Sequence, residues 1–296
     1  MKYCKLKTGT YDAFIIEKST FEAKTKQDYP YYTTGEHNEQ RQFAVCPACD
    51  NPIQIIGLYK ELKNTDKPYG KHYMGDVEGL AYYNEQAYRY CPYSNNKITV
   101  NANSRKEKLT ELEKSIYYSL RNNFDRVVYI LSKELDIWIT PSAARKMLST
   151  FVKGQGWLYP WATLTNIPFV FAHLTWNKSL FAQPILKGTD LYYAIQGRDN
   201  VTFEHLDYLP DYERLKAVDN RFIDICYCVI NHKRQLENDE LTETMELVVT
   251  DNISHEDIYL KQLIVTESRL FDITSKAKNY RNINLLQIAK DLMPDI

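Results

Sequence analysis

The sequence predicts an α+β protein built in three parts. A Cys-x-x-Cys pair lies between two short β-rich runs over residues 43–56. Apolar residues then recur at helical spacing over residues 109–151, and they alternate as in strands over residues 222–266. We therefore expect a β-rich front, a helical middle with a helix-turn-helix-like hairpin, and an antiparallel sheet followed by a helix. The expected boundaries are residues 1–100, 101–187 and 188–296.

Composition limits the class of protein. Of the 296 residues, 44% are hydrophobic and 25% are charged, which is typical of a globular chain. The net charge of −1 argues against a uniformly basic nucleic-acid binder. The charge is uneven, however: residues 97–153 carry 11 Lys or Arg and 6 Asp or Glu, whereas residues 188–260 carry 6 and 16. This asymmetry predicts domains with different functions.

The sequence also indicates the cellular compartment of the protein. No apolar segment follows Met1, so we expect no signal peptide, and no run of about 18 apolar residues predicts a membrane helix. Six cysteines without a secretion signal are typical of a reducing compartment. We therefore expect a cytoplasmic protein that does not contact a membrane.

The sharpest chemical signal in the front part is the pair Cys46 and Cys49, flanked by turn-forming residues. Two cysteines at this spacing can place both sulfurs on one metal across the tip of a β-hairpin, and zinc takes about four such ligands. His72, in a turn-rich loop, and Cys91, after an expected helix over residues 77–90, can complete a Cys₃His site. Such a site is closed to water, so the sequence predicts a structural zinc site of the zinc-finger type.

Two other interpretations of this pair remain open. A redox Cys-x-x-Cys usually opens a helix after a strand, whereas Asn51-Pro52 and a β-branched run follow here, which argues against a helix. Alternatively, the cysteines are unconnected buried thiols.

The run CPACDNPIQIIGLYK, followed by GKHY, resembles the amino-terminal zinc module of CoiA-like competence proteins. The resemblance covers residues 40–75 and implies a zinc-holding hairpin with an association with nucleic acid. The family has a second histidine two residues after the first, where this chain has Met74, and the pattern of the family's nuclease domain is missing downstream.

Two patterns in the front part are compatible with a nuclease. Asp12, Glu22 and Lys24 match a short Asp…Glu-x-Lys pattern on two expected strands, residues 11–17 and 20–24, and such residues can hold Mg²⁺ and activate water. The alternative for them is a solvated strand face. His72 is also compatible with an HNH-type nuclease, but the expected helix that follows contains no histidine to bind the metal.

Helices are expected in the middle part over residues 109–120 and 124–135, and a third begins at Thr140-Pro141, where Thr caps and Pro takes the first position. A helix-turn-helix would present Ser142, Arg145 and Lys146 to DNA. The alternative is a bundle hairpin with solvated basic residues.

An aromatic stretch follows, with a helix expected over residues 167–174; it is either deep core or a partner-binding surface. Residues 188–274 are predicted to be β, with strands over 222–230, 245–249 and 260–266. A helix over 284–292 closes the chain.

The leading hypothesis is a non-catalytic, zinc-containing protein associated with DNA or RNA, a regulator or a component of a bacterial DNA-processing or defence machinery. The alternatives are a metal-dependent nuclease and an adaptor or inhibitor that binds a basic protein through the acidic end.

Overall fold

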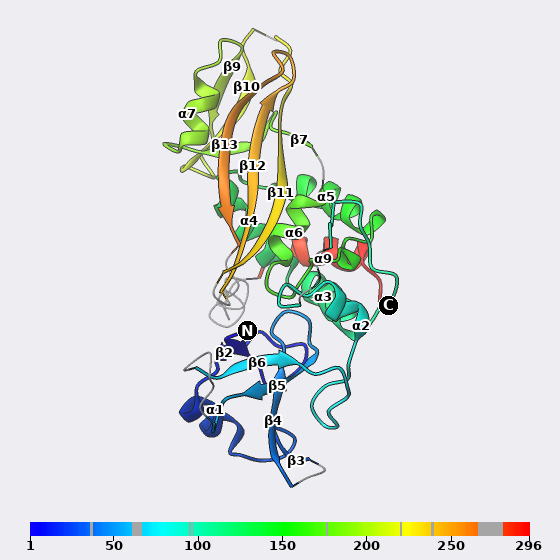
Figure 1. The fold of residues 1–296 in the computed structure, drawn as a ribbon. Helices are drawn as coiled ribbons and strands as arrows, with labels where there is room; N and C mark the ends of the chain where they lie inside the picture. Colours follow the sequence, from blue (N-terminus) through cyan, green and yellow to red (C-terminus); the bar gives the residue numbers. More distant parts are fainter. Residues whose placement is uncertain are drawn as a thin grey trace. The chain divides into compact units, whose positions relative to one another are not determined.

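The computed structural model is an α+β fold, drawn in Figure 1. It describes residues 1–35, 38–60, 67–94, 96, 98–175, 177–219, 221–237, 240–265 and 281–296. The chain clusters into two compact units, which we describe separately. Unit 1 contains Met1–Ile116, Leu158–Leu164 and Arg234–Thr242; unit 2 contains Tyr117–Trp157, Thr165–Lys233 and Glu243–Ile296.

Unit 1 is built on a four-stranded antiparallel sheet in the order β3-β4-β5-β6. The expected hairpin around the cysteine pair is confirmed as β4 (Gln40–Val45) and β5 (Pro52–Ile56), flanked by β3 (Tyr32–Thr34) and β6 (Tyr69–His72). A two-stranded sheet of β1 (Tyr3–Cys4) and β2 (Phe14–Ile15) completes the strands described near the amino terminus. The buried apolar residues of the hairpin include Phe43, Val45, Ile53 and Ile55.

The strand predicted over residues 20–24 is wrong, because helix α1 (Lys18–Thr25) occupies this stretch. The strand predicted over residues 11–17 is limited to the two residues of β2. Phe21 and Thr25, four residues apart, are both buried, and the Thr25 hydroxyl donates to the Phe21 carbonyl over 2.6 Å. In so short a stretch, the apolar residues fit both the two-residue period of a strand and the 3.6-residue period of a helix. Burial of one helical face favours the helix.

The helix predicted over residues 77–90 is shorter than expected, since α2 spans only Glu85–Arg89. Residues 77–81 form a turn closed by a bridge between Val77 and Ala81, with Gly79 at φ +75°. Glycine adopts this left-handed conformation without steric cost. The helix begins only where Asn84 caps it by accepting from the backbone of Ala87 over 3.0 Å.

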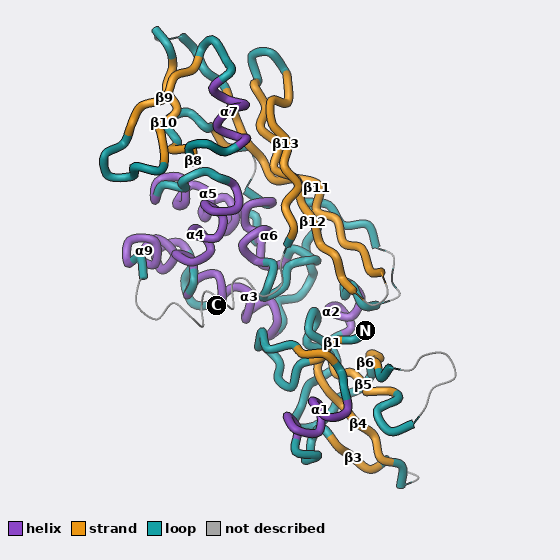
Figure 2. The backbone as a smooth tube through the Cα atoms, turned by 90° about the vertical axis from the view of Figure 1, so that its left-hand side faces the viewer, coloured by secondary structure: helices purple, strands orange, loops and turns teal. Residues whose placement is uncertain are grey.

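The predicted helices of the middle part are confirmed as α3 (Glu111–Asn122), α4 (Phe124–Leu135) and α5 (Pro141–Lys153). Thr140 caps α5 as expected, accepting from the Ala143 amide over 3.3 Å. A 3₁₀ turn (Gly156–Leu158), α6 (Ile167–His173) and α9 (Ile283–Leu292) follow. In unit 2, helices α4, α5, α6 and α9 gather into one layer (Figure 2), with Phe124, Phe151 and Phe171 in ring contact between them.

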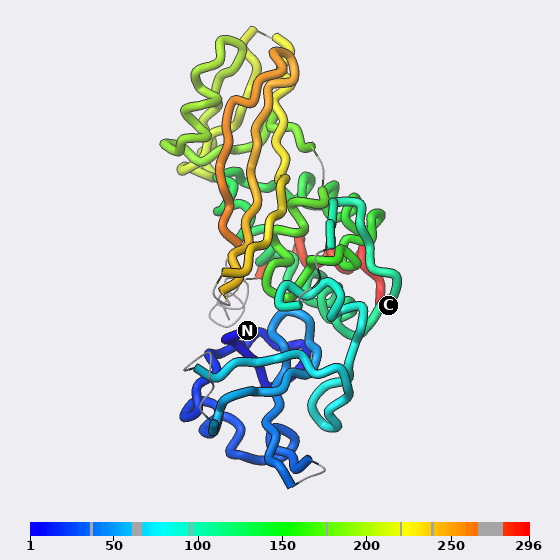
Figure 3. Tube along the Cα trace, in the orientation of Figure 1, coloured from blue at the N-terminus to red at the C-terminus, as the bar shows by residue number. Residues whose placement is uncertain are grey.

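The carboxy-terminal β region is confirmed in outline. Strands β7 (Lys178–Ser179), β11 (Ile225–Glu237), β12 (Glu240–Asp251) and β13 (Glu256–Ile264) form one sheet in the order β13-β12-β11-β7. The colour gradient of Figure 3 shows the last three running side by side in chain order. A second sheet has the order β8-β10-β9, formed by β8 (Pro184–Leu186), β9 (Val201–His205) and β10 (Tyr212–Ala217).

One stretch of this region is not β. Helix α7 (Asp190–Gln196) begins at Thr189, whose hydroxyl accepts from the Tyr192 amide over 3.3 Å, and it buries Leu191 and Ile195 four residues apart. Residues 266–274 of the predicted β region lie outside the described residues. None of the helices in the described part of the chain is both long and apolar enough to cross a membrane.

Candidate metal centre

The loop between β4 and β5 places the two cysteines of the pair together. The hairpin register ends at Val45 opposite Pro52, and beyond it the Cys46 amide donates to the Asn51 carbonyl over 2.8 Å. The Asp50 amide turns back to the Cys46 carbonyl over 3.2 Å, with Asp50 at φ 59°. Asp and Asn tolerate this left-handed conformation better than most residues. The loop therefore closes as a tight knuckle.

His72 reaches the knuckle because it ends strand β6, which pairs with β5. His72 lies opposite Ile53 in the register, and the next amide, of Tyr73, donates to the Pro52 carbonyl over 3.0 Å. The imidazole packs edge-on against the ring of Tyr88 at 5.0 Å between centroids. Sheet pairing and this aromatic contact together fix the position of the ring.

Cys91 comes from the segment that directly follows helix α2. Its amide donates to the Tyr88 carbonyl over 3.1 Å, which continues the helical turn past Arg89. Cys91 Sγ then lies 3.7 Å from Cys46 Sγ, while Cys49 Sγ lies 3.3 Å from His72 Nε2. All four ligand atoms lie within 4.8 Å of one another, close enough to hold one metal ion. Elsewhere in the described residues, no other group of three or more Cys, His, Asp or Glu side chains comes together in this way.

The three cysteines of the cluster are buried, whereas His72 is half-buried. Cys46, Cys49 and Cys91 are at most 5% exposed, and none of the cysteines forms a disulfide. Burial raises the pKa of the Cys49 and Cys91 thiols well above the ordinary value. For Cys46 burial acts in the same direction, but hydrogen bonds from its neighbours in the cluster outweigh it and leave its pKa well below the ordinary value. Three thiolates together therefore require a cation, which reverses the cost of burying their charge.

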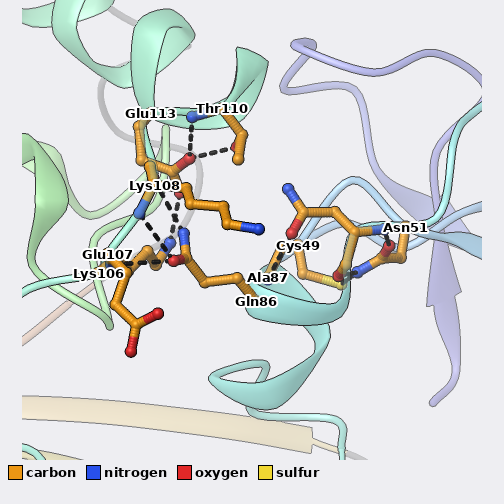
Figure 4. Close-up of polar contacts among 10 residues, drawn as sticks. Cys49, Asn51, Gln86, Ala87, Lys106, Glu107, Lys108, Thr110 and Glu113 are labelled. Carbon is orange, nitrogen blue, oxygen red and sulfur yellow. Dashed lines mark hydrogen bonds and ion pairs between the residues drawn. The ribbon is translucent and has the colours of Figure 1, made fainter.

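Asn51 donates a hydrogen bond to one ligand of the cluster and was not predicted from the sequence. The residue is fully buried, and its Nδ2 donates to Cys49 Sγ over 3.3 Å (Figure 4). The same side chain bonds to the backbone of Asn84, the cap of α2. Second-layer donors of this kind orient metal ligands and tune their charge. Its place two residues after the second cysteine is the only signal that could have indicated it.

The amino-terminal segment holds the knuckle on another side. Lys5 pairs with Val45 through two backbone hydrogen bonds of 2.8 and 3.0 Å, and its buried ammonium forms an ion pair with the Asp50 carboxylate. The Gly9 amide also donates to Asp50, over 2.8 Å. Burial raises the pKa of Asp50, and the charge of Lys5 opposes this rise.

The three residues of the nuclease pattern are placed apart from this cluster. Asp12 is exposed in the segment before β2, whereas Glu22 and Lys24 lie on α1. Glu22 accepts a hydrogen bond from the Tyr59 hydroxyl over 2.6 Å, and the Lys24 ammonium lies 5.0 Å from the centroid of the Phe14 ring. A catalytic role for these residues remains a prediction.

The predicted DNA-contacting residues Ser142, Arg145 and Lys146 are exposed on α5. Arg145 forms a 2.9 Å ion pair with Asp291 of α9. The connection between α4 and α5 pairs with β8, because the Trp138 amide donates to the Pro184 carbonyl over 2.8 Å. The two helices are thus joined by a segment held at a sheet edge, and contact with DNA remains a prediction.

Comparisons of this chain with family models, curated proteins and solved structures returned no match.

Proposed function

We propose that Cys46, Cys49, His72 and Cys91 bind one structural zinc ion. For a tetrahedral zinc with Zn–S of about 2.3 Å and Zn–N of about 2.0 Å, two sulfurs are separated by about 3.8 Å and a sulfur and a nitrogen by about 3.5 Å. The 3.7 Å between two sulfurs and the 3.3 Å between sulfur and nitrogen are close to these values. Thiolate and imidazole ligands in a tetrahedral arrangement favour zinc over harder cations.

The role of this zinc is to stabilise the fold of unit 1. Four protein ligands leave no coordination position for water or substrate, so the ion has no catalytic position. The ligands come from the β4–β5 knuckle, the end of β6 and the segment after α2. Zinc thus joins three segments that are separated in the sequence.

The function that these features support best is that of a zinc-stabilised, cytoplasmic protein that associates with nucleic acid within a bacterial DNA-processing or defence machinery. The observation that carries the zinc part of this proposal is the closed Cys₃His cluster, whose ligands all belong to unit 1. The resemblance of residues 40–75 to the zinc module of CoiA-like proteins supports the same class. The exposed Arg145 and Lys146 supply charge for phosphate contacts.

Binding of zinc-loaded protein to labelled single-stranded and duplex oligonucleotides across a salt series tests this function. We expect affinity to fall as salt rises, and the double variant Arg145→Ala/Lys146→Ala to reduce the slope of log K against log salt by about 1 to 2. Lys290→Ala, an exposed lysine of α9, is the matched control. Incubation with Mg²⁺ should leave the oligonucleotides intact. Absence of binding at low salt would contradict the proposed function, and Mg²⁺-dependent cleavage would favour the nuclease alternative.

A further inference from the structure

A small pocket lies beside the metal cluster, with the ligand Cys91 in its wall. Its volume is about 330 Å³, within the range of small-ligand sites. The described residues that line it belong to unit 1 and come from the end of α2, the segment after it, the 158–164 segment, and the adjoining ends of β11 and β12. The lining residues that matter here are Arg89, Tyr90, Trp161, Arg234, Leu236 and Leu241.

The charged residues that line this pocket, among those that the structure describes, are two arginines. Arg89 and Arg234 both line it, and no carboxylate is found among its lining residues in the part of the chain that the structure describes. A larger cavity of about 870 Å³, which shares Arg89 and Tyr90 with this pocket, differs because its lining mixes Lys and Arg with Asp and Glu. Two guanidinium groups in a confined space favour an anionic ligand, and guanidinium matches phosphate geometry.

Flat and apolar surfaces accompany the two arginines. The Arg234 guanidinium lies 5.8 Å from the centroid of the Trp161 ring, and the Arg89 guanidinium lies 5.8 Å from that of Tyr90. Leu236 and Leu241 add apolar wall. Aromatic rings and guanidinium planes are the surfaces on which unstacked bases are held.

We propose that this pocket binds one unstacked nucleotide of a single-stranded nucleic acid, with the base against Trp161 and Tyr90 and the phosphate beside Arg89 and Arg234. This inference rests on the proposed function and names the substrate class within it. Bases of a duplex are stacked and paired, so they cannot enter such a pocket without being extruded. The site therefore selects single strands.

The pocket also depends on the metal. Cys91 belongs to both the cluster and the pocket wall, and Tyr90 directly precedes it. Zinc binding at Cys91 fixes the backbone that carries Arg89 and Tyr90. Removing zinc should therefore weaken nucleotide binding and also destabilise the fold of unit 1.

The test uses the full zinc-loaded chain and fluorescence anisotropy with labelled 15-mers of dT and rU and a duplex of the same length. We expect both single strands, or the one that the site prefers, to bind more tightly than the duplex. Trp161→Leu should weaken single-strand binding by about 5-fold to 150-fold, the usual effect of losing one base-stacking contact. Arg234→Ala should weaken it by about 5-fold or more, because a charged contact to the phosphate is lost. Comparison of dT with rU separates DNA from RNA as the source of the nucleotide.

Lys233→Ala is the matched control, because this exposed lysine neighbours Arg234 on the same strand. Zinc content and melting temperature of each variant report its folding, and Arg234→Ala carries the test if Trp161→Leu does not fold. Unchanged single-strand binding in Arg234→Ala, or equal affinity for the duplex, would overturn the pocket assignment. If binding then falls only in Arg145→Ala/Lys146→Ala, the proposed function stands without the pocket. Absence of any binding by the wild type overturns both.

Discussion

Asn51 and Asn84 are joined by two hydrogen bonds: Asn51 Nδ2 donates to the Asn84 carbonyl over 3.0 Å, and Asn51 Oδ1 accepts from the Asn84 amide over 2.6 Å. The same Nδ2 group donates to Cys49 Sγ. Asn51 is fully buried, so water cannot replace these bonds. One side chain therefore couples the metal cluster to the residue that starts helix α2.

Asn51→Asp should lower the affinity for zinc by about 10-fold to 100-fold, as loss of a supporting contact does in other metal sites. Asp has the size of Asn but places an acceptor against the Cys49 sulfur. Competition with a chromophoric chelator measures the affinity. Asn103→Asp, in an exposed loop of the same unit, is the control. Equal affinities of the two variants would show that Asn51 does not support the cluster.

A buried ion pair lies near the start of helix α3. Lys106 Nζ lies 2.7 Å from Glu113 Oε1, and both side chains are at most 3% exposed. Glu113 also accepts from the amide and hydroxyl of Thr110 (Figure 4), so its carboxylate satisfies a backbone donor just before the start of α3.

Glu113→Gln should reduce the free energy of unfolding by about 3 to 5 kcal/mol, because it leaves the Lys106 charge buried without its partner. Urea unfolding of both proteins measures the change. The matched control is Glu111→Gln on the same helix, where an exposed pair with Lys114 is worth about 0 to 1 kcal/mol. Similar losses in both variants would contradict the importance of the buried pair.

The same pair predicts a dependence on pH. Burial alone raises the pKa of Glu113, but the charge of Lys106 and the hydrogen bonds from Lys106 and Thr110 outweigh it and lower the pKa below the ordinary 4.5. A group with a lowered pKa in the folded state stabilises the protein above its unfolded pKa. This stabilisation is lost as the pH falls below about 4.5.

Melting temperatures of wild type and Glu113→Gln, measured between about pH 3 and pH 6, check this sign. The difference between them should be largest near pH 6 and shrink as the pH falls. Acid loss of metal affects both proteins alike, so the comparison isolates Glu113. A difference that is constant, or that grows towards low pH, would refute the assignment.

The metal ligands illustrate what sequence patterns reveal. The two-residue spacing of Cys46 and Cys49 and the turn formers around them indicate a knuckle directly, because the geometry is local. His72 and Cys91 were inferred only as available ligand types, and sheet pairing of β6 and the position of α2 bring them within 4.8 Å of the pair. Asn51 was missed because its role depends on Asn84, 33 residues away.

Helices were predicted well where the apolar stripe is long, as in α4 and α5, and poorly where it is short. In α1 and α7 only two residues, four apart, are buried, and so weak a stripe does not distinguish helix from strand. Tertiary burial and the Thr189 cap decide these elements.

The most direct test of the account is the zinc content of protein purified under reducing conditions, measured by elemental analysis for wild type, Cys91→Ser and Cys228→Ser. Cys228 is a free cysteine outside the cluster. We expect about one zinc per chain in wild type and Cys228→Ser, and a loss of zinc together with stability of the front unit in Cys91→Ser. Reduced wild-type protein without zinc, or Cys91→Ser that retains zinc and stability, would contradict the Cys₃His centre.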